Sequence, residues 1–283
     1  MTTPWGAGPG VMSYVPPAPP GAVAFTPAEF LAWARGELAE HRGHRLPGPW
    51  QPGQHLGLLG KTREGKTNFA VWLCNELRDY VLALDPKGMD ESLSASGWPR
   101  MSTVPGGRAR PAWLSREHRA WNKIQDALAE EVPQRLIAGV STRTRQADAA
   151  NRRLMEDAIE YCRQAGGWTL LVDEHQVLSD PRMFGLGPSI ARMAITAARD
   201  KTSLIVNFQY LAWIERAGVR QSTLIGMART RDRDLIKMAA AAAGRPWQEL
   251  ATIFDEFEHK YWWAVISDEP RAPVLLVRPP KVT

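Results

Sequence analysis

The sequence predicts an α/β fold with a mainly parallel sheet flanked by helices. Apolar runs of strand length alternate with helical segments along most of the 283 residues, which is the order typical of parallel sheets. The run Gly60–Thr67 has the spacing G-x-x-x-x-G-K-T and stands between an apolar strand, 55–59, and an amphipathic helix, 67–78. Two further apolar runs, 80–85 and 168–174, end on carboxylates, as strands do at the ligand-binding edge of such sheets.

The N-terminal part predicts two segments before the main domain. Residues 1–25 are dense in Pro and Gly and have no hydrophobic period, which predicts a disordered arm. Residues 26–51 are expected to form a helix and a linker. The helix is predicted over 26–41, because Thr26 and Glu29 have the spacing of a capping box. The main domain is then expected over 52–283.

The alternation of strands and helices continues to the last residues. The segment from about 92 to 118 is rich in Ser, Gly, Pro and Arg and predicts no regular element. The remaining predicted elements are helices over 121–129, 147–164, 188–198 and 233–243, and strands over 135–140, 202–207, 223–228, 261–266 and 274–277. The last two strands predict a C-terminal β-hairpin.

The charge balance is basic. The formal net charge is +5 and the isoelectric point is near 9.4. Such a surface suits polyanions. Of the 35 basic residues 27 are arginine, which fits phosphate and nucleic-acid contacts and fits a GC-rich genome equally well.

The two cysteines and the lengths of the apolar stretches predict where in the cell the protein is found. Cys74 and Cys162 fall in predicted helices without a second Cys or a His at ligand spacing, so they are expected to be reduced packing residues. No stretch approaches the roughly 20 apolar residues that cross a bilayer. We therefore expect a soluble, cytoplasmic protein without membrane insertion.

The run Gly60–Thr67 predicts a phosphate-binding loop. Glycine at each end tolerates positive φ and close approach, so that successive N–H groups can turn toward a polyphosphate. Lys66 is expected to reach the β- and γ-phosphates of ATP, and the Thr67 hydroxyl to ligate Mg²⁺. The positive end of the helix that follows faces the same anion. The expected nucleotide-binding residues are Gly60, Lys61, Thr62, Arg63, Glu64, Gly65, Lys66, Thr67 and Asn68.

A second group of candidates is acidic. Asp173 is expected to hold Mg²⁺, directly or through water, and Glu174 to polarise the attacking water. Without the phosphate loop, the same pair would be interpreted as solvated acids at the start of a loop. For His175 two roles stay open, a sensor of the nucleotide state and a surface or hydrogen-bonding residue.

Polar and basic residues complete the predicted site. Gln209 lies just past the strand 202–207, where its side chain can contact the γ-phosphate or the water, and Asn207 competes for this role. An arginine finger for a neighbouring subunit is sought among four residues. They are Arg220, Arg229, Arg231 and Arg233, with Arg229 and Arg231 as the catalytic candidates. The alternative is that they form surface ion pairs with Asp232 and Asp234.

The order of these motifs resembles the FtsK/HerA superfamily of ATPases over about residues 52–278. The resemblance is carried by Gly60–Thr67, Leu84–Gly88, Leu171–Glu174, Ile205–Gln209 and Arg229–Asp234, the last followed by an alanine-rich helix. It implies a RecA-like core and ATP-driven movement of double-stranded DNA through a ring, usually a hexamer. It also implies that Gln209 acts as the sensor and that an arginine between 220 and 233 reaches across the subunit interface.

Two departures from the superfamily narrow this expectation. The loop reads Lys-Thr-Arg-Glu where the superfamily often has Thr-Gly-Ser, so that Arg63 and Glu64 place charge beside the phosphates. The sequence also shows no winged-helix module and no membrane segment. A compact member from a phage or a mobile element, working in DNA packaging or conjugative transfer, fits these departures.

Two basic stretches are candidates for contacts with DNA. Phosphate contacts are independent of sequence, so a motor can make and release them as it steps. Either stretch can equally be a solvated face. The first is Arg108, Arg110, Arg116, Arg119 and Lys123 with Trp113 and Trp121, and the second is Arg143, Arg145, Arg152 and Arg153.

Three functions remain open at this point. The first is a DNA-translocating ATPase, with an adaptor protein as a further partner. The second is an ATPase for protein secretion or filamentous phage assembly, whose basic face meets an acidic partner. The third is a switch that binds ATP and hydrolyses it slowly. Stimulation of hydrolysis by DNA separates the first from the second, and turnover at saturating ATP separates both from the third.

Overall fold

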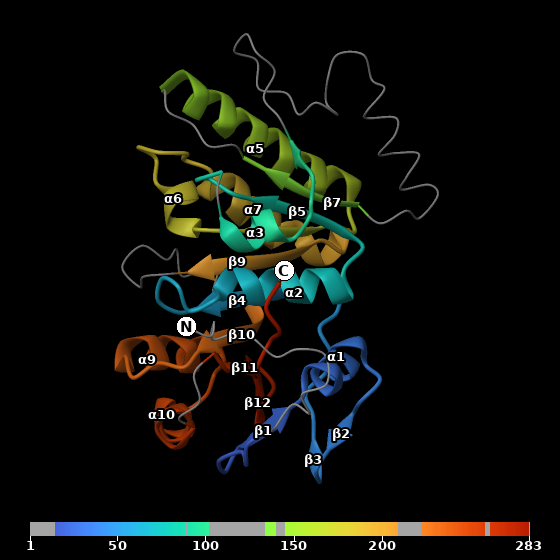
Figure 1. The fold of residues 1–283 in the computed structure, drawn as a ribbon, viewed down its shortest axis with the longest axis vertical. Coiled ribbons are helices and arrows are strands. Elements are labelled where there is room, and N and C mark those ends of the chain that lie inside the picture. Colours follow the sequence, from blue (N-terminus) through green and yellow to red (C-terminus); the bar gives the residue numbers. More distant parts are fainter. Residues whose placement is uncertain are drawn as a thin grey trace, which may run out of the picture.

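Ten strands form one mixed sheet in the computed structural model, which describes residues 15–88, 90–101, 134–139, 145–208, 222–257 and 261–282 (Figure 1). From one edge to the other the strands are β1 (Ala22–Phe25), β12 (Val274–Val277), β11 (Trp263–Ser267), β10 (Ser222–Ala228), β4 (His55–Leu59), β9 (Ser203–Phe208), β8 (Thr169–Val172), β5 (Tyr80–Leu84), β7 (Gln134–Ala138) and β6 (Arg100–Met101). A separate hairpin joins β2 (Glu40–His41) to β3 (His44–Arg45).

The sheet is parallel except around one strand. β11 runs antiparallel to β10 and to β12, and the other neighbouring strands pair in parallel. The expected α/β class with a mainly parallel sheet is confirmed, and so is the C-terminal hairpin. Because β1 pairs in parallel with β12, the N-terminal strand extends the sheet beyond that hairpin.

Helices cover both faces of the sheet (Figure 1). One face carries α1 (Pro27–Arg35), α2 (Lys66–Leu77) and α3 (Glu91–Ala95), whose apolar side chains lie in one core cluster. The other face carries α5 (Arg145–Ala165), α6 (His175–Ser179), α7 (Gly187–Asp200), α9 (Arg233–Ala242) and α10 (Trp247–Glu256) around a second cluster. Both faces of the central strands are therefore buried, which explains their unbroken apolar runs.

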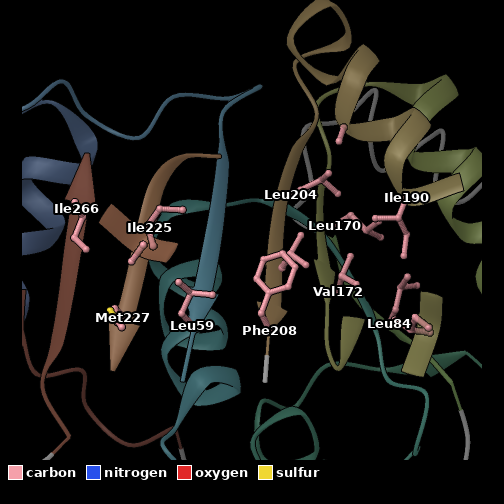
Figure 2. Packing of buried hydrophobic residues seen from close by; sticks show 14 of the residues in the cluster. Leu59, Leu84, Leu170, Val172, Ile190, Leu204, Phe208, Ile225, Met227 and Ile266 are labelled. Atoms are coloured by element: carbon pink, nitrogen blue, oxygen red, sulfur yellow. The ribbon is translucent and has the colours of Figure 1, made fainter. Parts of the chain in front are cut away.

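The two core clusters meet the sheet through alternate residues of each strand. In β4, Leu58 lies in the cluster under α2, whereas Leu59 lies in the cluster under α7. Figure 2 shows Leu59, Phe208 and Val172 from adjacent strands on the face that Ile190 of α7 covers. This alternation follows from the two-residue period of a strand.

The prediction of a disordered arm over 1–25 is wrong for its last residues. Residues 22–25 form β1, and all four are buried. The apolar run Ala-Val-Ala-Phe gains backbone partners along one side by pairing with β12, and the sequence alone does not show that this edge is open.

The first helix is shorter than predicted. The capping box is present, since Glu29 N–H donates to Thr26 Oγ1 at 3.2 Å and Thr26 N–H donates to Glu29 Oε2 at 2.8 Å. The helix ends at Arg35 because Gly36 adopts the left-handed conformation of a C-cap. Residues 40–45, expected to end the helix and begin the linker, form the β2–β3 hairpin instead.

The other helices and strands that the sequence predicts within the described residues lie within a few residues of their predicted bounds. The sequence predicts no element where α3, α6, α10 and β6 form. The expectation of no regular element from about residue 92 is therefore wrong at its start, where α3 and β6 lie. The predicted helix over 121–129 lies outside the described residues. Cys74 and Cys162 are buried and free, as expected. Among the described helices, none is long and apolar enough to cross a bilayer.

Candidate nucleotide-binding site

The carboxyl ends of five neighbouring strands bring the predicted residues to one edge of the sheet. The phosphate loop follows β4, Asp85 follows β5, and Asp173 follows β8. Asn207 stands near the end of β9, beside Leu58 of β4 in the register. Strand β10 ends on the other side of β4. At this edge open α/β sheets bind their ligands.

The phosphate loop has a defined conformation. Gly65 caps α2 with φ of 84°, and Arg63 has φ of 68°. Gly60 does not adopt positive φ, so that part of the expectation is wrong. Its small size matters for another reason, because a Cβ there would lie 2.6 Å from Glu64 Oε2 and 3.1 Å from Ala228 Cβ.

Lys66 is folded back onto the loop. Its Nζ donates to the carbonyl oxygens of Gly60 at 2.7 Å and Lys61 at 2.8 Å, and the residue is only 7% exposed. Burial lowers the pKa of Lys66 from its ordinary value, while the carboxylates of Glu64, Asp173 and Glu174 oppose this shift. A buried ammonium held against the backbone of the phosphate loop is well placed to bind a polyphosphate.

Glu64 stabilises the phosphate loop by a hydrogen bond within the loop. Its Oε2 accepts the Lys61 N–H at 2.5 Å, and the side chain is half-buried. Lys61, Thr62 and Arg63 are exposed. The departure from the usual loop composition thus supplies an internal hydrogen-bond acceptor.

Asp173, Thr67 and Asn207 form the polar centre of the site. Thr67 Oγ1 donates to Asp173 Oδ1 at 3.0 Å, and Asn207 Nδ2 donates to the same oxygen at 2.7 Å. Asp173 is 6% exposed and Asn207 is 1% exposed. Burial, and then the charge of Asp90, raise the pKa of Asp173 to about 7.

This centre fits a magnesium ion bound together with a nucleotide. Mg²⁺ takes few protein ligands and keeps phosphate oxygens and waters, and hydroxyl and carboxylate oxygens are suitable donors. A cation bound here would stabilise the charged carboxylate of Asp173 and so oppose the rise in its pKa that burial causes. The described residues hold no group of three or more His, Cys, Asp and Glu that would bind a metal without a nucleotide.

Glu174 follows Asp173 in the left-handed conformation, with φ of 51°, and stands at the N-cap of α6. Its carboxylate forms an ion pair with Lys87, which comes from the turn after β5. The strand register brings these turns together, because Leu84 of β5 pairs with Val172 of β8.

His175 belongs to the core beneath the site. It is 5% exposed, its Nε2 lies 3.1 Å from Ser179 Oγ, and its ring packs at 5.2 Å from that of Phe208. Burial lowers the pKa of His175 to about 4, so the ring is neutral near pH 7. These contacts favour the hydrogen-bonding role over the sensor role.

The side chain of Asn68 is engaged by the C-terminal segment. Its Nδ2 donates to the Pro280 carbonyl at 2.9 Å, and its Oδ1 accepts the Val282 N–H at 2.8 Å. Figure 1 shows the C-terminal end of the chain beside α2. Any contact of Asn68 with a nucleotide therefore falls to its backbone N–H.

The arginine candidates are only partly described. Arg229 follows β10 beside the phosphate loop of its own chain, since Met227 pairs with Leu59, and it is half-buried. Arg231 is exposed. Arg233 begins α9 and is exposed.

Several predicted residues lie outside the described ranges. They are Gln209, Arg220, the basic stretch from Arg108 to Lys123, and Arg143. For Arg145 only the backbone is described, within α5. Arg152 and Arg153 are exposed on that helix.

Two further residues stand out at the site. The sequence offers Asn207 only as a competitor of Gln209, yet its amide contacts Asp173 directly. No sequence signal assigns a role to Lys87 itself. The turn Asp-Pro-Lys-Gly that carries it belongs to the superfamily resemblance, but only the fold places Lys87 beside Glu174.

Comparison with solved structures identifies proteins of the same fold. The genome packaging NTPase B204 of Sulfolobus turreted icosahedral virus 2, in complex with sulfate, is 14% identical, with a TM-score of 0.51 over 81% of this chain and 97% of that chain. B204, the DNA-packaging ATPase of Sulfolobus turreted icosahedral virus, is 15% identical, with a TM-score of 0.51 over 81% and 98%. VirB4 of Thermoanaerobacter pseudethanolicus is 12% identical, with a TM-score of 0.50 over 78% and 88%. No family model and no curated protein matches the sequence.

Proposed function

We propose that this chain is an ATP-hydrolysing motor of the FtsK/HerA superfamily that moves double-stranded DNA as a ring oligomer. The observation that carries the proposal is the convergence of Lys66, Thr67, Asp173, Glu174 and Asn207 on one edge of the sheet. This set contains a cation for the phosphates, a place for Mg²⁺ and a carboxylate next to that place.

The same residues account for the chemistry of hydrolysis. Lys66, which now donates to the carbonyls of Gly60 and Lys61, would turn to the β- and γ-phosphates, and Thr67 and Asp173 would hold Mg²⁺. When bound, Mg²⁺ neutralises charge that develops on the phosphate oxygens. Water attacks the γ-phosphorus, the bond to the oxygen that bridges to ADP breaks, and Glu174 accepts the proton of the water.

Asn207 is suited to orient this water. Its Nδ2 is fixed by Asp173, and its Oδ1 is buried and has no hydrogen-bond partner among the described residues. A buried acceptor without a partner is unfavourable until a donor arrives, so it favours a bound water. The proposed sensor role thus passes to Asn207, alone or together with Gln209.

The proposed substrate of the motor is DNA. One protein of the same fold is described as a DNA-packaging ATPase, and the net charge of +5 suits a polyanion. We place the protein in phage DNA packaging or conjugative transfer, with a homo-hexamer as the working ring and an adaptor protein as a further partner.

The experiment that tests this function is steady-state ATP hydrolysis with and without double-stranded DNA, at low and moderate salt. The wild type is compared with Glu174→Gln and with a matched control, Glu91→Gln, whose side chain is exposed on α3. We expect DNA to stimulate the wild type and the control in a salt-sensitive way. Glu174→Gln should lose turnover by roughly 10²-fold or more, because it removes the proton acceptor.

Other outcomes point to the other functions. Strong hydrolysis that ignores DNA at every salt concentration contradicts the DNA motor and favours an ATPase that handles protein. Nucleotide binding without turnover, with DNA present, favours the switch.

A further inference from the structure

The turn Asp85-Pro86-Lys87-Gly88 is held by several hydrogen bonds and an ion pair of the Asp85 carboxylate. The Asp85 carboxylate is 1% exposed and accepts the Gly88 N–H at 2.9 Å. Its other oxygen accepts the Asp90 N–H at 3.3 Å and pairs with Arg100 at 2.8 Å. Both carboxylate oxygens of Asp85 are thus engaged in holding the turn.

The backbone on the β7 side reinforces this turn. Asp85 N–H donates to the Ala138 carbonyl at 2.9 Å, and Arg100 donates to the Gly139 carbonyl at 3.0 Å. Gly139 passes so close that a Cβ there would lie 2.0 Å from the Asp85 carbonyl oxygen. Only glycine permits this approach, so the position of the turn is defined by packing as well as by hydrogen bonds.

The residue that this framework presents is Lys87. Its side chain is 61% exposed, yet its ammonium pairs with the Glu174 carboxylate, whose side chain is 12% exposed. Glu174 stands at the N-cap of α6 and makes no side-chain cap there. Its carboxylate is turned toward the end of β5 instead.

This ion pair opposes the role assigned to Glu174. The Lys87 ammonium engages Glu174 Oε1, so this oxygen has to leave the ion pair before it can accept a proton from the water.

We propose that Lys87 is a positioning residue that holds Glu174 in a resting ion pair, so that ATP hydrolysis requires this pair to open. The inference rests on the proposed function, because it assumes that Glu174 accepts the proton. The resting pair lowers the basal rate of ATP hydrolysis without weakening nucleotide binding, which depends on Lys66 and Thr67.

The test compares Lys87→Met, Lys87→Arg and the control Lys237→Met in the full chain. Lys237 is exposed on α9 and lies 4.0 Å from Asp234, so it controls for the loss of a surface lysine. We expect Lys87→Met to raise basal kcat by roughly two- to fivefold, the range that a partly exposed ion pair supplies when the barrier changes by a factor of about ten in rate for each 1.4 kcal/mol. Lys87→Arg should keep the low rate.

Two further measurements distinguish the effect of the resting ion pair between Lys87 and Glu174 from a general change in structure. The affinity for a fluorescent ATP analogue should stay within about twofold of the wild type, since a uniform binding effect would change it. In the Glu174→Gln background, Lys87→Met should have no effect, because the partner of Lys87 is then uncharged.

The inference is overturned if Lys87→Met lowers kcat or leaves it unchanged, or if it raises kcat equally in the Glu174→Gln background. Its failure is distinguishable from failure of the proposed function. If Lys87→Met raises basal kcat but DNA does not stimulate hydrolysis, the proposed resting ion pair is supported and the proposed DNA-translocating function is contradicted. Absence of binding of the ATP analogue to the wild type removes both.

Discussion

At the scale of single residues, the site depends on which polar atoms already have partners. Asp173 Oδ1 receives hydrogen bonds from both Thr67 and Asn207, whereas Asn207 Oδ1 receives none from the described residues. Asp173 Oδ1 is therefore oriented before any ligand binds, and Asn207 Oδ1 is available to accept a hydrogen bond from a ligand or a water. Both features belong to a site that is organised in advance of its substrate.

Asn207→Ala tests this orientation. The variant removes the donor that fixes Asp173, and loss of such a supporting contact typically lowers metal affinity or activity by about 10–100-fold. We expect a higher Mg²⁺ concentration for half-maximal hydrolysis together with a lower kcat, both measured by titrating Mg²⁺ at saturating ATP. Asn75→Ala is the control, because Asn75 accepts a hydrogen bond from Trp98 away from the site. An unchanged Mg²⁺ requirement in Asn207→Ala contradicts the proposed role.

Gly139→Ala tests the close approach that fixes the turn after β5. A Cβ would collide with the Asp85 carbonyl at 2.0 Å, and φ is 127°, where alanine is strained. We expect the free energy of unfolding to fall by about 3 kcal/mol or more. Gly97→Ala is the matched control, because φ is 74° and nothing lies within 4 Å, so only about 1 kcal/mol of strain is expected. Equal losses in urea unfolding would show that the contact with Asp85 does not matter.

At the scale of elements, one histidine joins α7 to the sheet. His55 of β4 accepts the Leu204 N–H on Nδ1 at 3.2 Å, and its Nε2 lies 3.0 Å from the Ala194 carbonyl. Nδ1 must be unprotonated to accept, so Nε2 carries the proton and donates it to Ala194. The neutral ring is 5% exposed, and burial lowers the pKa of His55.

This link predicts a loss of stability in acid. Below the unfolded pKa of about 6.5 the unfolded chain binds a proton at His55 that the folded chain does not bind, so stability falls as the pH decreases. The stabilisation is complete above pH 6.5 and is lost toward the lower folded pKa, by at most about 1.4 kcal/mol per pH unit.

Urea unfolding between pH 7.5 and 5.5 checks this dependence. His55→Asn should lose about 1 kcal/mol at pH 7.5, because the bond to Ala194 is absent, and should depend less steeply on pH. His175, which is also buried and neutral, keeps part of the slope. His44→Asn, in the exposed β2–β3 hairpin, should behave as the wild type. Identical slopes for His55→Asn and the wild type would contradict the assignment.

At the scale of the whole molecule, the two arginine candidates are unequal. Arg229 is half-buried beside the phosphate loop of its own chain, whereas Arg231 is exposed at the same edge. An arginine that serves a neighbouring subunit has to reach out of its own chain. The geometry therefore favours Arg231 as the residue that acts across the interface of the proposed ring.

Mixed oligomers separate the two cases. Arg231→Ala and Lys66→Ala should each lower kcat, by roughly 10³-fold if the arginine acts as a finger. Mixing the two variants should restore part of the activity, because a Lys66→Ala subunit can supply its Arg231 to a neighbour with an intact phosphate loop. Arg229→Ala mixed with Lys66→Ala should regain none if Arg229 acts within its own chain. Failure of both mixtures would remove the proposed finger in trans.

Most elements of the fold could be predicted from short-range patterns in the sequence. The capping box at Thr26 and Glu29, the loop Gly60–Thr67 and the apolar strands ending at Asp85 and Asp173 each follow from short-range rules, and the structure contains all of them. The β-hairpin near the C-terminus was likewise readable from its two apolar runs.

Contacts between segments that are far apart in the sequence were determined only by the tertiary structure. Whether residues 22–25 form a strand depends on an open edge at β12, and the partner of Glu174 depends on the register between β5 and β8. Asn68 meets residues 280 and 282 for the same reason. Periodicity and motifs report the preferences of neighbours in sequence, whereas these contacts join residues separated by 87 to more than 200 positions. The sequence therefore determined the fold class and the phosphate loop, and only the packed sheet determined which side chains meet at its edge.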